Sequence, residues 1–172
     1  MDGSAHDSRA IRTASETAEV ILACGAVVQI LKHITGRESP FEATTWTGKW
    51  NLFPNQIEYH KHVPRYDAFP SGHVATALAT LTVIQENYPR QQWITYVGYP
   101  IIGCVATGLM ARGIHWVSDF PLAIALGYSF GEIVVRGHTE ENNKLTSKIM
   151  PTIRPTLTTF QTPALQLSWD LY

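Results

Sequence analysis

Charged side chains are scarce in this sequence of 172 residues. Asp, Glu, Lys and Arg together make up 16% of the chain, against roughly 25% in an ordinary soluble domain. The 13 basic and 14 acidic side chains give a net charge of −1. A chain without a basic excess is poorly suited to neutralise a phosphate backbone, so we expect no nucleic-acid partner.

Cysteine is equally rare. The chain has two cysteines, Cys24 and Cys104, and both lie within apolar runs. This excludes a disulfide scaffold and a cysteine-rich zinc site. Apolar residues make up 45% of the chain, enough for a sizeable core, so global disorder is also excluded. The remaining classes are a tightly packed helical domain and a domain partly embedded in a membrane.

Four apolar segments predict an all-α bundle. They cover residues 20–31, 71–84, 91–111 and 116–135. The third has no charged residue and is long enough to cross a hydrocarbon core of about 30 Å. The other three are shorter, which is more typical of buried or interrupted helices. Pro100 and Pro121 should kink or break the last two helices. We favour a membrane-embedded bundle over a soluble one.

Polar segments flank the expected domain, which covers residues 17–136. Residues 1–16 lack the basic-then-apolar order of a secretory signal. Residues 137–172 form a Thr- and Pro-rich tail that we expect to be irregular, although Leu165, Leu167, Trp169 and Leu171 alternate at the period of a strand. Inside the domain, residues 37–70 form a long polar and aromatic loop, and loops of that length are usually functional.

Two segments carry residues suited to binding an anion. Lys32 and Arg37 follow the first apolar run. Ser71 and Gly72 begin the second helix, where free backbone N–H groups and the helix dipole favour an anion, and His73 follows directly. Taken singly, the first pair is typical of a solvated helix end and the second of a helix cap.

A third segment adds a candidate nucleophile. His115 and Asp119 are spaced i,i+4, so on a helix they would share one face. The carboxylate could then fix the tautomer of the imidazole and leave its other nitrogen free to attack. Such a pair can also be a structural hydrogen bond. The presence of all three segments in one small chain favours a site that holds a phosphate-like anion and attacks it.

These segments resemble a known family. In order, Lys32, the Pro-Ser-Gly-His block at 70–73 and the His-x-x-x-Asp block at 115–119 are similar to the three signature motifs of the type-2 phosphatidic acid phosphatase and vanadium haloperoxidase superfamily. The resemblance covers roughly residues 20–135. It implies an all-α bundle and a phosphohistidine intermediate.

The resemblance also implies a role for each motif residue. His115 would be the nucleophile, Asp119 would orient it, and His73 would protonate the leaving oxygen. The phosphate would be cradled by Lys32, Ser71 and the amide of Gly72.

Two arginines of the family pattern are missing. Ser39 and Leu109 stand where the first and third motifs carry them. Arg37 and Arg112 lie two and three residues away and could supply the same charges. The chain also has fewer residues before Lys32 than family bundles normally use, so we expect an incomplete version of that bundle.

The implied activity is hydrolysis of a lipid phosphate, an isoprenoid pyrophosphate or a small phosphomonoester, without a metal or cofactor. The resemblance places such an enzyme in or on a membrane of the cell envelope, with its site on the outer or periplasmic side. Two alternatives are a haloperoxidase that uses vanadate and a truncated member with weak or no activity. A further alternative is a zinc site formed by His60 and His62 with His73 or His115.

Overall fold

The computed structural model describes residues 3–149, 152–157 and 163–168, with side chains described over residues 8–140. The described residues form five α-helices and two strands, which are α1 (Gly3–Thr35), α2 (Gln56–Lys61), α3 (Gly72–Asn87), α4 (Trp93–Ala111), α5 (Phe120–Ile149), β1 (Thr152–Leu157) and β2 (Pro163–Ser168). The chain divides into two units, Met1–Val135 and Arg136–Tyr172. The helices of the first unit confirm the predicted all-α bundle.

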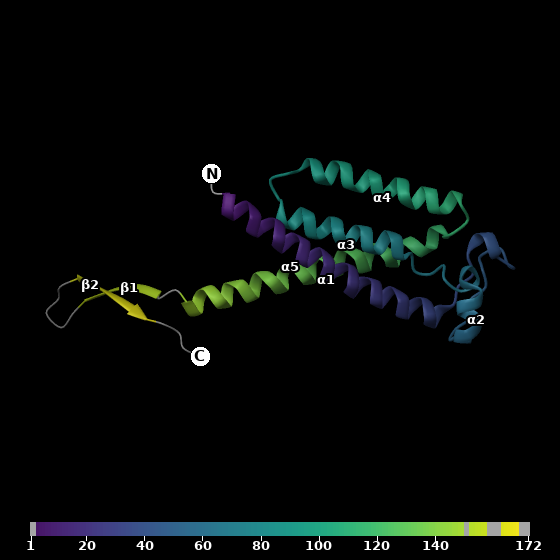
Figure 1. Cartoon of the computed structure of the whole chain (residues 1–172), viewed down its shortest axis with the longest axis horizontal. Coiled ribbons are helices and arrows are strands. Elements are labelled where there is room, and N and C mark those ends of the chain that lie inside the picture. Colours follow the sequence, from purple (N-terminus) through teal and green to yellow (C-terminus); the bar gives the residue numbers. More distant parts are fainter. Residues whose placement is uncertain (1–2, 150–151, 158–162, 169–172) are drawn as a thin grey trace. The chain divides into compact units, whose positions relative to one another are not determined.

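Helix α3 is the central element of the first unit. It packs against both α1 and α4 (Figure 1). The buried side chains of α1 recur at every fourth position, at Val20, Cys24 and Val28. This spacing places them on one face of the helix, and they join small and β-branched residues of α3 in one core. The bundle is therefore held together mainly by small side chains.

Helices α3 and α5 approach each other closely where α5 carries glycine. A Cβ at Gly131 would lie 2.5 Å from the Cβ of Thr82, and one at Gly127 would lie 2.4 Å from the carbonyl oxygen of Ala75. Neither distance is compatible with van der Waals contact. The absence of two side chains on α5 therefore sets the separation of these helices.

Helix α1 begins much earlier than residue 20, so that boundary was wrong. Its polar first half contains Glu16, which is fully buried and accepts hydrogen bonds from Arg12 at 2.7 Å and from Asn87 of α3. This half of α1 packs against α3 through polar residues, so a search for apolar runs does not detect it. The helix ends at Thr35, and Gly36 follows with a φ of +50°.

Contrary to the prediction, neither Pro100 nor Pro121 breaks its helix. Helix α4 continues through Pro100. Helix α5 begins at Phe120, so Pro121 lies in its first turn. Proline is tolerated there because the first N–H groups of a helix have no intrahelical partner. The helix predicted from residue 116 thus starts later, as α5 at Phe120. Residues 117–119 form a separate 3₁₀ turn, η3 (Val117–Asp119).

The tail is more regular than predicted. Strands β1 and β2 pair antiparallel, with Ile153 opposite Leu167. The partner strand contains Pro155, which interrupts a strand pattern in the sequence but is tolerated on an edge strand. Of the alternating apolar residues, Trp169 and Leu171 lie outside the described residues.

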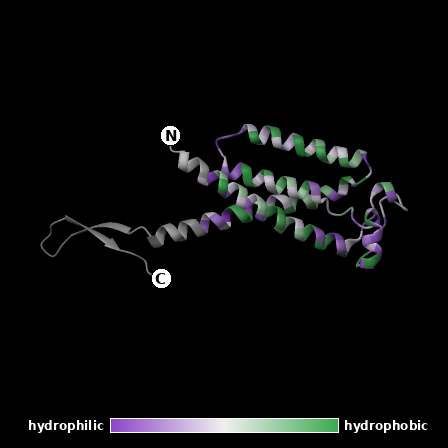
Figure 2. Ribbon diagram, viewed as in Figure 1, coloured by the Kyte–Doolittle hydropathy of each residue, from purple (hydrophilic) through white to green (hydrophobic). Residues whose placement is uncertain are grey.

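Three helical segments of the described chain are long and apolar enough to cross a membrane, where we expected one. They are Ser8–Thr35, Trp93–Ala111 and Val117–Glu140. Helix α4 exposes large apolar side chains such as Trp93, Tyr96 and Ile101, a surface better suited to lipid than to water. Hydrophilic residues gather in the connection that contains α2 and in the turn between α3 and α4 (Figure 2). This distribution indicates a membrane protein.

The close contact of α3 and α5 predicts a position-specific effect of added methyl groups. Gly131→Ala should lower the free energy of unfolding by about 1–3 kcal/mol, because the methyl group overlaps Thr82. Gly103→Ala on α4 is the matched control, since no atom lies within 4 Å of a Cβ there, and it should be neutral or stabilising by up to about 1 kcal/mol. Thermal unfolding of the detergent-solubilised variants measures both. Equal effects at the two positions would contradict this packing.

Candidate active site

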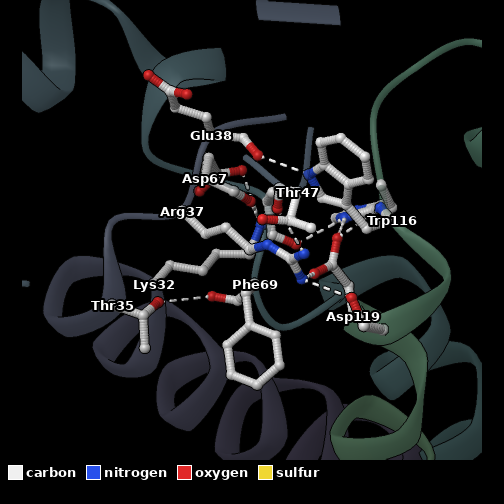
Figure 3. Close-up of polar contacts among 12 residues, drawn as sticks. Lys32, Thr35, Arg37, Glu38, Thr47, Asp67, Phe69, Trp116 and Asp119 are labelled. Carbon is white, nitrogen blue, oxygen red and sulfur yellow. Dashed lines mark hydrogen bonds and ion pairs between the residues drawn. The ribbon is translucent and has the colours of Figure 1, made fainter. Parts of the chain in front are cut away.

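The extended segment of residues 67–71, which leads into α3, connects all three motifs. Its main-chain atoms form hydrogen bonds to residues before and after it in the sequence, among them the bond between Thr35 and Phe69 (Figure 3). The partners of these main-chain atoms include Lys32, Thr35, Arg37, His115 and Asp119. The three motifs therefore meet at one place although they are far apart in the chain.

His115 is buried, and its Nδ1 lies 2.7 Å from the carbonyl oxygen of Ala68. A carbonyl oxygen only accepts hydrogen bonds, so Nδ1 carries a proton, and in the neutral imidazole the lone pair is then on Nε2. The carboxylate of Asp119 lies 3.5 Å from the same Nδ1. The expectation that a shared helix face brings these two residues together was wrong, because both precede α5 and η3 makes the contact. The main-chain carbonyl, more than Asp119, orients the imidazole.

His73 lies in the first turn of α3, with its ring edge-on to that of His115. The ring centroids are 6.3 Å apart and the interplanar angle is 70°. The pKa of His73 is lowered by partial desolvation of its ring and by the nearby His115 and Lys32, while Asp67 opposes this shift. A phosphoryl group between the rings could lie about 3 Å from a nitrogen of each, which is the separation that reaction requires.

Two buried polar atoms at this site have no hydrogen-bond partner among the described residues. They are the Oγ of Ser71, which is fully buried, and the Nε of Arg37. Ser71 is the N-cap of α3, but its side chain makes no capping hydrogen bond. Buried donors are nearly always paired. Their lack of a partner indicates a place for an acceptor, such as the oxygen of an anion, beside the N-terminus of α3.

The guanidinium of Arg37 is held by several hydrogen bonds. Its Nη1 donates to the Oγ of Ser118 at 2.9 Å and forms an ion pair with Asp119. Its Nη2 donates to the carbonyl oxygen of Thr47 at 2.9 Å. Both members of the ion pair are buried. Asp119 therefore has a second function beside His115, which is to compensate the charge of Arg37.

Two indole rings also contact this guanidinium. Its carbon lies 4.8 Å from the ring centroid of Trp50 and 5.4 Å from that of Trp116, within the range of cation–π attraction. The Nε1 of Trp116 donates to the carbonyl oxygen of Glu38 at 2.8 Å, which fixes this ring. The position of Arg37 is thus determined by its hydrogen bonds and by its contacts with the two indole rings.

Arg112 lies outside this arrangement. It is the C-cap of α4 and its side chain is exposed. Ser39 and Leu109, at the two expected arginine positions, are both buried. Of the two candidate replacements, the structure therefore brings Arg37 and not Arg112 to the other motif residues.

Lys32 is buried, and its partners were not predicted from the sequence. Its Nζ donates to Asp67 twice, to the carboxylate at 2.7 Å and to the carbonyl oxygen at 2.9 Å. The other carboxylate oxygen accepts from the hydroxyl of Tyr59 at 2.5 Å. Burial and the hydrogen bond with Asp67 raise the pKa of Tyr59 far above its usual value. The only sequence signal for Asp67 and Tyr59 was their place in the long polar loop at 37–70.

Glu38 was also missed, and it shapes the loop next to Arg37. Its carboxylate accepts hydrogen bonds from the backbone N–H groups of Thr44 and Lys49, both at 3.0 Å. Burial acts to raise the pKa of Glu38, but these hydrogen bonds and the charge of Arg65 outweigh it, so the pKa is lowered. The ionised carboxylate therefore closes the loop that carries Thr47 and Trp50.

His60 and His62, the pair on which the zinc alternative depends, are exposed. His60 bonds to the main chain of its own helix, and His62 lies 3.4 Å from Glu58. No group of three or more His, Cys, Asp or Glu side chains in the described part of the chain is arranged to hold a metal ion. The zinc alternative therefore lacks a third ligand among these residues.

An apolar groove of about 500 Å³ begins at His73. Side chains of α1, α3 and α4 line it, among them Ile21, Ala77, Ile84 and Ile101. Ile84 is eleven residues after His73, which corresponds to about 16 Å along a helix. Half of a bilayer's hydrocarbon core measures about 15 Å. The groove therefore has the length of one leaflet.

Comparison with known proteins supports the motif assignment. The family model described as PAP2 superfamily matches residues 15–143. The chain is also 32% identical over 90 residues to a protein of Porphyromonas gingivalis named Lipid A 1-phosphatase, a match that covers 48% of this chain and 20% of that protein. The chain thus spans only about a fifth of that relative. No solved structure matches significantly.

The buried ion pair predicts that Arg37 matters far more for stability than Arg112. Arg37→Ala should lower the free energy of unfolding by about 3–5 kcal/mol, because it leaves Asp119 buried without a counter-charge. Arg37→Lys should recover only part of this loss, because an ammonium cannot reproduce the planar set of donors. The exposed Arg112→Ala is the matched control. Thermal unfolding compares the three variants, and equal stability of Arg37→Ala and Arg112→Ala would disprove the assignment.

Proposed function

Because the chain belongs to the PAP2 superfamily, we propose that it is a phosphatase that hydrolyses the phosphate ester of a lipid through a phosphohistidine intermediate. One observation carries the proposal. The ring centroids of the buried His115, whose Nδ1 donates to Ala68, and of His73 are 6.3 Å apart, and the donors of Ser71 and Arg37 have no partner among the described residues. This combination provides a nucleophile, an acid and donors for a phosphoryl group.

The first step forms a bond between Nε2 of His115 and phosphorus. As this bond forms, the bond from phosphorus to the ester oxygen breaks, and the electron pair stays on that oxygen. His73 donates a proton to it, so the alcohol leaves neutral. The imidazole of His115 gains positive charge, which the Ala68 carbonyl and Asp119 stabilise through Nδ1–H.

The second step releases phosphate. His73, now neutral, accepts a proton from a water molecule, whose oxygen attacks phosphorus as the bond to Nε2 breaks. The electron pair of that bond returns to the imidazole, so both histidines regain their starting protonation. Nothing is consumed except water and the ester.

Negative charge on the phosphoryl oxygens requires donors, and the chain has several. Lys32 has one N–H group left after its two bonds to Asp67. The Nε of Arg37 and the hydroxyl of Ser71 have no partner in the described part of the chain, and the first N–H groups of α3 have no partner within the helix. These groups would hold the phosphate without a metal ion.

The groove supports a lipid as the alcohol part. It begins at His73, which would protonate the ester oxygen, so a chain attached to that oxygen would extend into the groove. The relative named Lipid A 1-phosphatase acts on a phosphorylated lipid, as its name states. The proposed substrate therefore places its phosphate between the histidines and an acyl chain along α3.

The proposal predicts phosphate release that depends on His115. The purified chain in detergent should release phosphate from phosphatidic acid with a higher kcat/KM than from p-nitrophenyl phosphate, because the groove binds the acyl chain. His115→Ala should lower kcat by about 10³-fold or more. Release of phosphate from neither substrate, or full activity of His115→Ala, would refute the proposal.

Two controls separate the parts of this prediction. Ala77→Trp would fill the groove and should lower kcat/KM for phosphatidic acid but not for p-nitrophenyl phosphate. EDTA should leave the rate unchanged, because Lys32 and Arg37 supply the positive charge. Loss of activity on chelation that zinc restores would instead favour the site with His60 and His62.

The environment of His73 predicts that kcat/KM falls as the pH rises, beginning in the acidic range. A general acid must be protonated, and the pKa of His73 in the free protein is lowered by desolvation and by His115 and Lys32. As the pH rises, His73 therefore loses its proton at a pH below the ordinary imidazole pKa of about 6.5. The basic limb of the pH profile of kcat/KM should lie below that value and disappear in His73→Gln. A limb above it would contradict this assignment.

A further inference from the structure

Lys32 depends on one residue for its place in the site. Only 5% of its surface is exposed, and a buried ammonium needs a counter-charge and acceptors. Asp67 supplies both, because its carboxylate lies 2.7 Å and its carbonyl oxygen 2.9 Å from Nζ. These contacts occupy two of the three N–H groups of Lys32. The direction of the third is thereby fixed.

Asp67 is itself held in place by Tyr59. The tyrosine is buried, stacks on His33 with ring centroids 4.2 Å apart, and donates its hydroxyl proton to the carboxylate oxygen that Lys32 does not use. Each carboxylate oxygen thus has its own donor. The carboxylate cannot rotate without losing one of these bonds.

The same main chain connects this arrangement with the nucleophile. The carbonyl oxygen of Asp67 accepts from Lys32, and that of the next residue, Ala68, accepts from His115. Two consecutive carbonyl groups therefore place the cation and the imidazole relative to each other. A shift of Lys32 would change its distance from any group that His115 attacks.

We propose that Asp67 is a positioning residue that directs Lys32 at the phosphoryl group, and that Tyr59 supports it. The inference rests on the proposed function, but it also makes a statement about binding that needs no turnover. A carboxylate near an anion site repels the anion through space. Here the carboxylate increases anion affinity, because without it Lys32 loses the two hydrogen bonds that orient its third N–H group.

The test uses inorganic phosphate as the probe and the full chain in detergent. Binding is measured by isothermal titration and by the rise of the melting temperature with phosphate concentration. Asp67→Asn preserves shape and removes the charge, and it should weaken phosphate binding by about tenfold. Tyr59→Phe should act in the same direction with a smaller effect. Glu58→Gln, which removes an exposed carboxylate of α2, is the matched control and should bind as the wild type does.

A double-mutant cycle separates positioning from a general structural effect. If Asp67 acts through Lys32, Asp67→Asn should have no further effect on phosphate affinity in a Lys32→Met background. Unchanged or tighter phosphate binding by Asp67→Asn, additive losses in the double variant, or a wild type that binds no phosphate would each overturn the inference. A wild type that binds phosphate but hydrolyses no ester would refute the proposed function alone, and the cycle would still decide the role of Asp67.

Discussion

The rest of the site depends on the main-chain N–H and carbonyl groups of Ala68. Its N–H group donates to the carbonyl oxygen of Arg37 at 3.0 Å, and its own carbonyl oxygen accepts from His115 at 2.7 Å. One residue's main chain therefore joins the end of the first motif to the imidazole of the third. Because these bonds use main-chain atoms, no substitution at this position other than proline removes them directly. The fold between α1 and α3 thus acts as a frame that presents side chains from separate helices to one point.

Around this frame, each buried cation has its own acid. Arg37 is paired with Asp119, and Lys32 with Asp67. Buried ion pairs contribute little net stability, because both charges lose their hydration. Their value here is that each carboxylate holds its cation in one position and orientation within the site. The indole rings beside Arg37 act in the same sense, since their faces attract a cation without neutralising it.

The sequence predicted some parts of this site better than others. The order of the three motifs indicated that Lys32, Ser71, His73 and His115 would meet, since each of these residues belongs to one of the motifs. Asp67 is 35 residues from the lysine that it binds, in a loop without periodicity, so no pattern connected the two. The spacing of His115 and Asp119 suited a helix as well as a turn, and only the start of α5 decided between them. The carbonyl that orients His115 belongs to an alanine, whose side chain carries no chemical signal.

The groove beside His73 bears on how the two products of the proposed reaction would leave the site. Hydrolysis of a lipid phosphate produces one molecule that is soluble in water and one that is not. With the acyl chain lying along α3 and the phosphate held by polar residues at the ends of α1 and α3, the two products would separate into different phases. The alcohol would remain in the bilayer while phosphate diffuses into the surrounding water. Their recombination at the site would then require an encounter from two compartments, which favours the reaction in one direction.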